Sequence, residues 1–211
     1  MNKTLRTLKS WLSALLLFRD PKRLNDVFVL EEATADTEAA AEAAARALAH
    51  PAGARAAAER YRLPPVDLDA LATLPEGTLG RVFSERMRAQ GLDPAAIPRR
   101  TADGDAEYVR AHLYETHDLW HVALGFDTDV PGELGLQAVY AAQVGGPLAP
   151  LLVTGGLLQA LVLARADWPA RVDAVVRGWE LGRRAQPLFG VRWHELYARP
   201  LADVRAQLGV G

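Results

Sequence analysis

Apolar residues recur every three or four positions along most of the chain, which is the spacing of one face of an α-helix. Residues 3–18 show this pattern first, with five leucines on one side and Lys and Arg between them. β-branched residues are sparse, and no stretch alternates polar with apolar residues as a half-buried strand does. The pattern therefore predicts an all-α protein whose first element is an amphipathic, basic helix.

Proline and glycine residues mark where the predicted helices begin and end. An Ala-rich helix is expected over residues 25–49, ended by Pro51, and Pro64-Pro65 marks a further break. Later helices are expected from Thr78 to Gly91, from an Asp105 cap to about Leu124, from Pro131 onward, and over 147–166, 170–186 and 201–208. Since no internal repeat or long linker occurs, residues 23–211 are predicted to form a single helical domain that follows the N-terminal helix of residues 1–22.

Two segments resemble membrane or export sequences, but each carries features that argue against that interpretation. The mostly apolar run at residues 11–18 is short, is followed by Arg19-Asp20-Pro21 and precedes no cleavage site. Residues 134–164 carry no charge over 31 positions, which is long enough to span a bilayer. Because Gly145-Gly146-Pro147 and other Gln, Gly and Pro residues interrupt this run, we expect two buried helices joined there, with a spanning helix as the minority alternative.

Composition and charge exclude several classes of function. Half of the 211 residues are hydrophobic and 24% are charged, as in a globular protein. The net charge of −2 gives no overall field that would attract nucleic acid, although residues 1–30 carry a local net charge of +4. The chain has no cysteine, which excludes disulfides, thiolate metal ligands and a cysteine nucleophile.

Two of the five histidines lie four residues apart on the helix predicted to end near Leu124. His117 and His121 therefore project from one face, and Asp118 borders that face because it lies three residues before His121. A Gly- and Pro-containing turn follows, which lets the chain reverse and bring Glu133 back toward the histidines. Imidazole and carboxylate are the ligands that a divalent metal takes where thiolates are absent, so these four side chains form a candidate metal site.

Three alternatives remain open from the residues alone. A polar helix face can carry two histidines at this spacing without binding a metal. Zinc proteases of the H-E-x-x-H type also use this spacing, but Asp118 stands where they carry the catalytic Glu. Iron oxygenases with two histidines and one carboxylate match in ligand type, although their ligands usually stand on β-sheets.

The segment THDLWHVALGFDTDVPGE (116–133) resembles the metal motif of the ubiquinone biosynthesis family Coq4, in which H-D-x-x-H is followed by eleven residues and Glu. Two further blocks resemble the same family in the same order, LPEGTLGRVF (74–83) and the C-terminal residues 178–210. The resemblance covers about residues 70–210. One departure is visible, because His112 and Tyr114 stand in a stretch where the family often carries Arg.

The resemblance implies an all-helical, membrane-associated protein that binds a divalent metal and a prenylated molecule. The implied activity is removal of the C1 carboxyl group from a polyprenylated hydroxybenzoate, with C1 hydroxylation proposed beside it. The metal ligands would be His117, Asp118, His121 and Glu133, with Asp118 and Glu133 taking part in catalysis. Zinc is the expected metal and iron the alternative. The competing hypothesis is a non-catalytic organiser that gathers lipid intermediates and the other biosynthetic enzymes.

Candidate substrate-binding residues follow from the apolar segment and from a basic pair. Glycines at 145, 146, 155 and 156 would allow close approach of a prenyl tail. The expected channel walls are Leu136, Val139, Tyr140, Leu148, Leu151, Leu152, Leu157 and Leu158, with ordinary core packing as the alternative for each. Arg183 and Arg184, beside Trp179 and with Trp193 nearby in sequence, are candidates for holding an anionic head group, with a solvated helix end as the alternative.

The partners expected from these features are a polyprenylated quinone precursor, other ubiquinone-biosynthesis enzymes and a membrane surface, with a homodimer possible and nucleic acid excluded. We expect a cytoplasmic protein that associates peripherally with the inner membrane if its source is bacterial.

Overall fold

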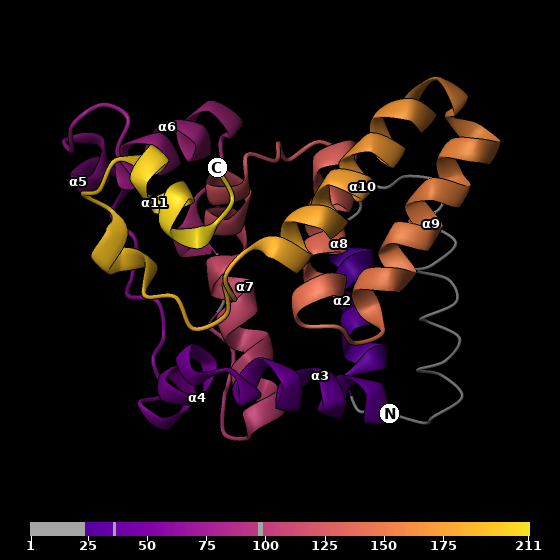
Figure 1. The fold of residues 1–211 in the computed structure, drawn as a ribbon, viewed down its shortest axis with the longest axis horizontal. Helices are drawn as coiled ribbons and strands as arrows, with labels where there is room; N and C mark the ends of the chain where they lie inside the picture. The colour runs from indigo at the N-terminus through magenta and orange to yellow at the C-terminus, as the bar shows by residue number, and fades with distance from the viewer. Residues whose placement is uncertain (1–23, 36, 97–98) are drawn as a thin grey trace. The chain divides into compact units, whose positions relative to one another are not determined.

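A computed structural model describes residues 24–35, 37–96 and 99–211 (Figure 1). Within these residues the chain forms helices, short 3-10 segments and loops, with no strand, so the prediction of an all-α domain is confirmed. The predicted N-terminal helix, and with it the boundary at residue 22, lies outside the described residues. The α-helices are α2 (Leu24–Thr34), α3 (Glu38–Ala49), α4 (Pro51–Ala58), α5 (Leu68–Ala72), α6 (Leu79–Gln90), α7 (Asp105–Leu124), α8 (Val130–Gln143), α9 (Leu148–Leu163), α10 (Trp168–Arg184) and α11 (Leu201–Leu208). The 3-10 segments are η1 (Pro94–Ala96), η2 (Arg165–Asp167) and η3 (Trp193–Leu196).

Two details of the predicted helices were wrong, and the helix that begins at Pro51 was missed, although α3 ends before Pro51 as predicted. Residues 25–49 form α2 and α3 rather than one helix, because Thr37 accepts a hydrogen bond from the N–H of Ala40 and so caps a new helix. Pro51 also begins a helix, α4, where its fixed φ suits the first position. Gly104, not Asp105, is the N-cap of α7, and its N–H donates to the Glu107 carboxylate at 3.2 Å.

The first compact unit contains residues 127–183 together with the described part of residues 24–43. Its helices α8 and α9 lie side by side (Figure 1) and meet at Gly145-Gly146, both with φ near +80°. The uncharged run at 134–164 is therefore two helices, as predicted, but the expectation that both are buried is wrong for α9. Five of its large apolar side chains are at least 44% exposed: Leu151, Leu158, Leu161, Val162 and Leu163. No described helix is long and apolar enough to cross a membrane. Glycines allow the neighbouring helices to approach closely: a methyl group on Gly178 of α10 would lie 2.0 Å from the carbonyl oxygen of Gly135 of α8.

A buried arginine fastens α10 to α9 in the same unit. Arg171 is 2% exposed and donates to the carbonyl of Gly156 at 2.8 Å and to the side chain of Gln159 at 2.6 Å. Its other terminal nitrogen lies 3.0 Å from the Asp167 carboxylate. A buried charge is tolerated only when it is paired in this way, so the cluster fixes the α9–α10 hairpin.

The second compact unit contains residues 44–126 and 184–211. Helices α6 and α11 both contact α7, and the core includes the fully buried Leu79, Met87, Trp120 and Leu188. An isolated antiparallel bridge joins Thr78 to Pro200, so two blocks far apart in the sequence, 74–83 and 178–210, meet here.

We expect replacement of Gly178 by Ala to lower the free energy of unfolding by about 1–3 kcal/mol, because the added methyl group collides with backbone that cannot move aside. The matched control is Gly155→Ala in α9, where a methyl group would meet no atom within 4 Å. Since Ala favours a helix over Gly, this control should be neutral or stabilising by up to about 1 kcal/mol. Urea titration followed by circular dichroism measures both, and equal effects of the two substitutions would contradict the close packing of α8 and α10.

Candidate metal centre

The last two turns of α7 are held by hydrogen bonds at their carbonyl end. Gly125 ends the helix with φ 69°, and both its N–H and that of Phe126 point to the carbonyl of His121. Arg205 of α11 donates to the carbonyls of Val122 and Ala123 at 3.0 and 2.9 Å. Because the last carbonyls of a helix have no partner within it, these contacts fix the direction in which the two histidines project.

His117 and His121 lie close enough to share one ion. Their Nε2 atoms are 3.3 Å apart, and the two rings are nearly perpendicular at 82°. His121 is fully buried and His117 is half-buried. Two ligands that each lie about 2 Å from a tetrahedral ion are roughly 3.3 Å apart, so the spacing of the two nitrogens fits a metal.

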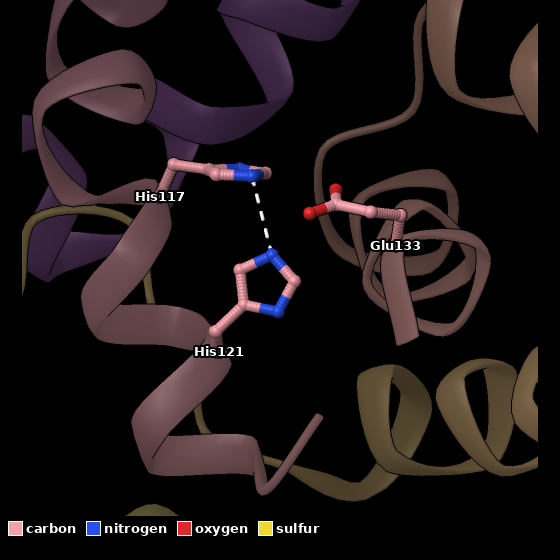
Figure 2. Close-up of side chains that lie close together, drawn as sticks. All are labelled: His117, His121 and Glu133. Atoms are coloured by element: carbon pink, nitrogen blue, oxygen red, sulfur yellow. Dashed lines mark hydrogen bonds between the residues drawn. The ribbon is translucent and has the colours of Figure 1, made fainter. Parts of the chain in front are cut away.

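The turn after α7 places Glu133 in the first turn of α8. The side chain of Asp129 caps α8 by accepting from the N–H of Gly132 at 2.8 Å. Gly132 is required at this position, because a Cβ there would lie 2.0 Å from the carbonyl oxygen of Asp127. Figure 2 shows the Glu133 carboxylate pointing toward the two imidazoles. One ligand atom from each of the three side chains lies within 4.8 Å of the others.

The chemistry of this group fits a divalent ion. Two imidazoles and one carboxylate are the donors of a catalytic zinc site, and the same set binds iron in oxygenases. Three protein ligands leave a coordination position for water or substrate, whereas a purely structural zinc site is usually closed by four. The predicted grouping of His117, His121 and Glu133 is therefore confirmed as a possible metal site, while the identity of the metal stays a prediction.

Asp118 is not one of the three side chains that gather in this group. It is half-buried and follows His117 directly on α7. Its roles as a ligand and in catalysis stay predictions.

The predicted substrate-binding residues occupy different environments. Tyr140 on α8 is buried and Leu152 on α9 is half-buried, whereas Arg183 and Arg184 are exposed at the end of α10. Among the other expected wall residues, Leu136 and Val139 are fully buried, whereas Leu151 and Leu158 are 44% and 50% exposed. Trp179 is 46% exposed and Trp193 is fully buried. The roles of these residues in substrate binding stay predictions.

Sequence reasoning missed a cluster of arginines that surrounds Glu115 on α7. Arg62 donates to both oxygens of Glu115, at 2.9 and 2.5 Å, and the Arg99 guanidinium lies 3.6 Å from the same carboxylate. The Arg100 guanidinium lies 4.4 Å from the centre of the Tyr114 ring. Arg62 and Glu115 are 53 positions apart in the sequence, so no local pattern could indicate this ion pair.

His112 was noted only as a departure from the family pattern, and it lies in an aromatic core. Its ring is fully buried, 4.7 Å from the ring of Phe189 and 5.8 Å from that of Tyr61. The N–H of Gly190 lies 3.3 Å from His112 Nε2, so this nitrogen is the acceptor and Nδ1 carries the proton. Burial lowers the pKa of His112 to about 4, so the ring is neutral at pH 7.

Comparison with known proteins gives matches to a family and to a solved structure. The profile of the family described as "Coenzyme Q (ubiquinone) biosynthesis protein Coq4" matches residues 1–211. A crystal structure from Nostoc punctiforme, of a protein provisionally described as a ubiquinone biosynthesis protein, superposes with a TM-score of 0.84 at 30% identity. The superposition covers 97% of this chain and 98% of that one.

Curated relatives carry the same description. The chain is 34% identical over 151 residues to "Ubiquinone biosynthesis protein COQ4, mitochondrial" of Eremothecium gossypii, covering 70% of this chain. It is 32% identical over 166 residues to the homologue from Rattus norvegicus, covering 76% of this chain. The chain spans only 46% of the length of the first relative and 61% of the second.

We expect His121→Ala and Glu133→Gln each to lower metal affinity by at least about tenfold, because each removes one of three donors. The measurement is metal content of protein that has never met a chelator, followed by competition with a chromophoric chelator. His50→Asn is the matched control, since His50 is an exposed N-cap of α4 and Asn also caps helices. Equal metal content in all four proteins would contradict the site.

The buried His112 predicts a loss of stability in acid. The folded pKa of about 4 lies below the ordinary value of 6.5, so the unfolded chain binds the extra proton first as the pH falls. The free energy of unfolding that depends on a neutral His112 is fully present above about pH 6.5 and is lost progressively down to about pH 4. The total loss is about 3 kcal/mol. His112→Gln should flatten this dependence by one proton in urea titrations between pH 7 and 4. An unchanged slope would show that the ring is not held neutral.

Proposed function

This chain belongs to the Coq4 family of coenzyme Q (ubiquinone) biosynthesis proteins, and on that premise we propose that it removes the C1 carboxyl group of a polyprenylated hydroxybenzoate. The observation that carries the proposal is the convergence of His117, His121 and Glu133, whose ligand atoms lie within 4.8 Å of one another. An ion held by these three side chains would still be able to take an oxygen of the substrate as a ligand.

The reaction balances without a redox partner. The bond between C1 and the carboxylate carbon breaks, CO₂ leaves, and the electron pair left at C1 takes up one proton. A divalent ion bound at the three donors supplies a Lewis acid that stabilises the developing negative charge. Hydroxylation at C1 in addition would require an oxidant, and iron rather than zinc would then suit the donor set.

The side chains of α7 and α8 have separate roles in this proposal. His117, His121 and Glu133 would hold the ion, and the hydrogen bonds at the end of α7 keep the imidazoles in place. Asp118, which follows His117 and is half-buried, is the candidate to deliver the proton to C1, directly or through a water. Tyr140 and Leu152 would line the path of the prenyl tail, and Arg183 and Arg184 would contact an anionic group.

A second candidate function is an organiser that binds lipid intermediates and partner enzymes. Large apolar side chains exposed on α9 favour it, because such patches commonly mark contact surfaces. They are Leu151, Leu158, Leu161, Val162 and Leu163, each at least 44% exposed. The same residues support contact with other biosynthetic enzymes and a peripheral position on a membrane, which in a bacterium would be the cytoplasmic face of the inner membrane. Formation of a homodimer is a further proposal.

Asp118→Asn should lower the rate of CO₂ release from a carboxyl-labelled prenylated hydroxybenzoate by about 100-fold or more while metal content stays unchanged, because the amide cannot deliver the proton. Glu133→Gln should lose both metal and activity. Asp173→Asn, on the exposed side of α10, is the matched control and should behave as the unaltered chain does.

Ubiquinone production in a strain that depends on this protein separates the two functions. A Glu133→Gln chain that has lost its metal but still supports normal quinone production would overturn the catalytic proposal and favour the organiser.

A further inference from the structure

The guanidinium of Arg100 lies beside the face of α7 that carries His117 and His121, about one turn before His117. We propose that Arg100 binds the carboxylate of the aromatic substrate and so positions it beside the metal centre. The inference rests on the proposed function for the identity of the substrate. Its structural basis, the placement of Arg100 by Tyr114 and Glu115, is independent of that function.

Helical spacing places Tyr114 in line with the candidate ligands. Tyr114 precedes His117 by three residues and Asp118 by four, and both spacings bring side chains onto one helix face with Cβ atoms about 5–6 Å apart. The Arg100 guanidinium lies over the Tyr114 ring at 4.4 Å. It therefore carries its positive charge next to the row formed by Tyr114, His117 and His121.

The backbone of Arg100 is fixed as well as its side chain. Arg62 Nη2 donates to the carbonyl of Arg100 at 3.2 Å and to Oε1 of Glu115 at 2.5 Å. Consecutive residues of α7 therefore hold both ends of Arg100: Glu115 acts on its backbone through Arg62, and Tyr114 contacts its guanidinium. The neighbouring Arg99 donates to the carbonyl of Leu63 at 2.6 Å, which ties the same loop down a second time. A side chain held in this way loses less conformational entropy when it binds a ligand.

The chemistry of this arrangement suits a carboxylate. A guanidinium that lies over an aromatic ring uses its face for that contact, and its N–H groups form hydrogen bonds in its own plane, where a carboxylate can accept two in parallel. Glu115 faces two guanidinium groups, those of Arg62 and Arg99, so one negative charge is set against two positive ones.

The expected role is in binding rather than in bond breaking. The carboxylate carries a full charge in the substrate and loses it as CO₂ forms, so a guanidinium stabilises the bound substrate more than the transition state. Arg100 is therefore a positioning residue, and its removal should raise KM more than it lowers kcat.

Calorimetric titration with two probes tests the proposal. The probes are 3-farnesyl-4-hydroxybenzoate and its carboxamide, which has the same shape without the charge. The unaltered chain should bind the acid more tightly than the amide. Arg100→Gln should weaken the acid by about 10- to 100-fold and leave the amide and the metal content unchanged. Arg46→Gln on the exposed side of α3 is the matched control: it removes the same charge far from Arg100 in the sequence and should keep the preference for the acid.

Variants of Tyr114 test the contact between the Arg100 guanidinium and the ring. Tyr114→Phe keeps the ring and should keep the preference for the acid, whereas Tyr114→Leu should reduce it. If Arg100→Gln weakens acid and amide equally, or neither, Arg100 has only a structural role and the proposal is overturned.

Decarboxylation is measured on the same proteins, so that the two proposals fail separately. An Arg100-dependent preference for the acid without CO₂ release would overturn the proposed function and support the present inference. If the Arg100→Gln variant releases CO₂ with an unchanged KM, the present inference is overturned and the proposed function is supported.

Discussion

The candidate metal centre depends on how α7 ends. A helix leaves its last carbonyls without partners, and here three groups satisfy them: the N–H of Gly125, the N–H of Phe126 and the guanidinium of Arg205. Gly125 can take the required left-handed conformation at little cost because it has no side chain. With the carbonyl end fixed, the rings of His117 and His121 can stand 3.3 Å apart at their nitrogens without a flexible helix end beneath them. The same end starts the turn that leads to Glu133.

The two histidines use only one side of α7, and the other sides are committed to different kinds of contact. His112 and Tyr108 enter an aromatic core with Phe189, where burial keeps the imidazole neutral. Glu115 takes part in an ion-pair cluster with Arg62 and Arg99. One helix of 20 residues therefore carries the aromatic contact and the charged anchor on one face, because Tyr108, His112 and Glu115 are spaced i, i+4 and i+7, and carries the metal-ligating row on the opposite face. This division explains why the average hydrophobic pattern of α7 is a poor guide to its function.

Local rules predicted much of the fold and the core of the site, because the features concerned involve few residues. Period-3.6 patterning and the breaks at Gly145-Gly146 gave the later helices, and i, i+4 spacing with a turn gave His117, His121 and Glu133. The break between α2 and α3 was missed because a single threonine cap competes with strong alanine helix propensity there. The contacts of Arg62 and Arg205 could not be predicted, because each guanidinium reaches a carboxylate or carbonyl more than 50 positions away that only the packed helices bring within reach.

The two compact units are interleaved along the chain, and this has a consequence for synthesis on the ribosome. Residues 44–126 need residues 184–211 to complete their unit, so α7 must wait for most of the chain to emerge before Arg205 reaches its last carbonyls. Until then the histidine-bearing end of α7 lacks one of its three stabilising partners. Assembly of the metal-binding geometry should therefore be among the last events of folding, after the contacts between the consecutive helices α8 and α9 have formed.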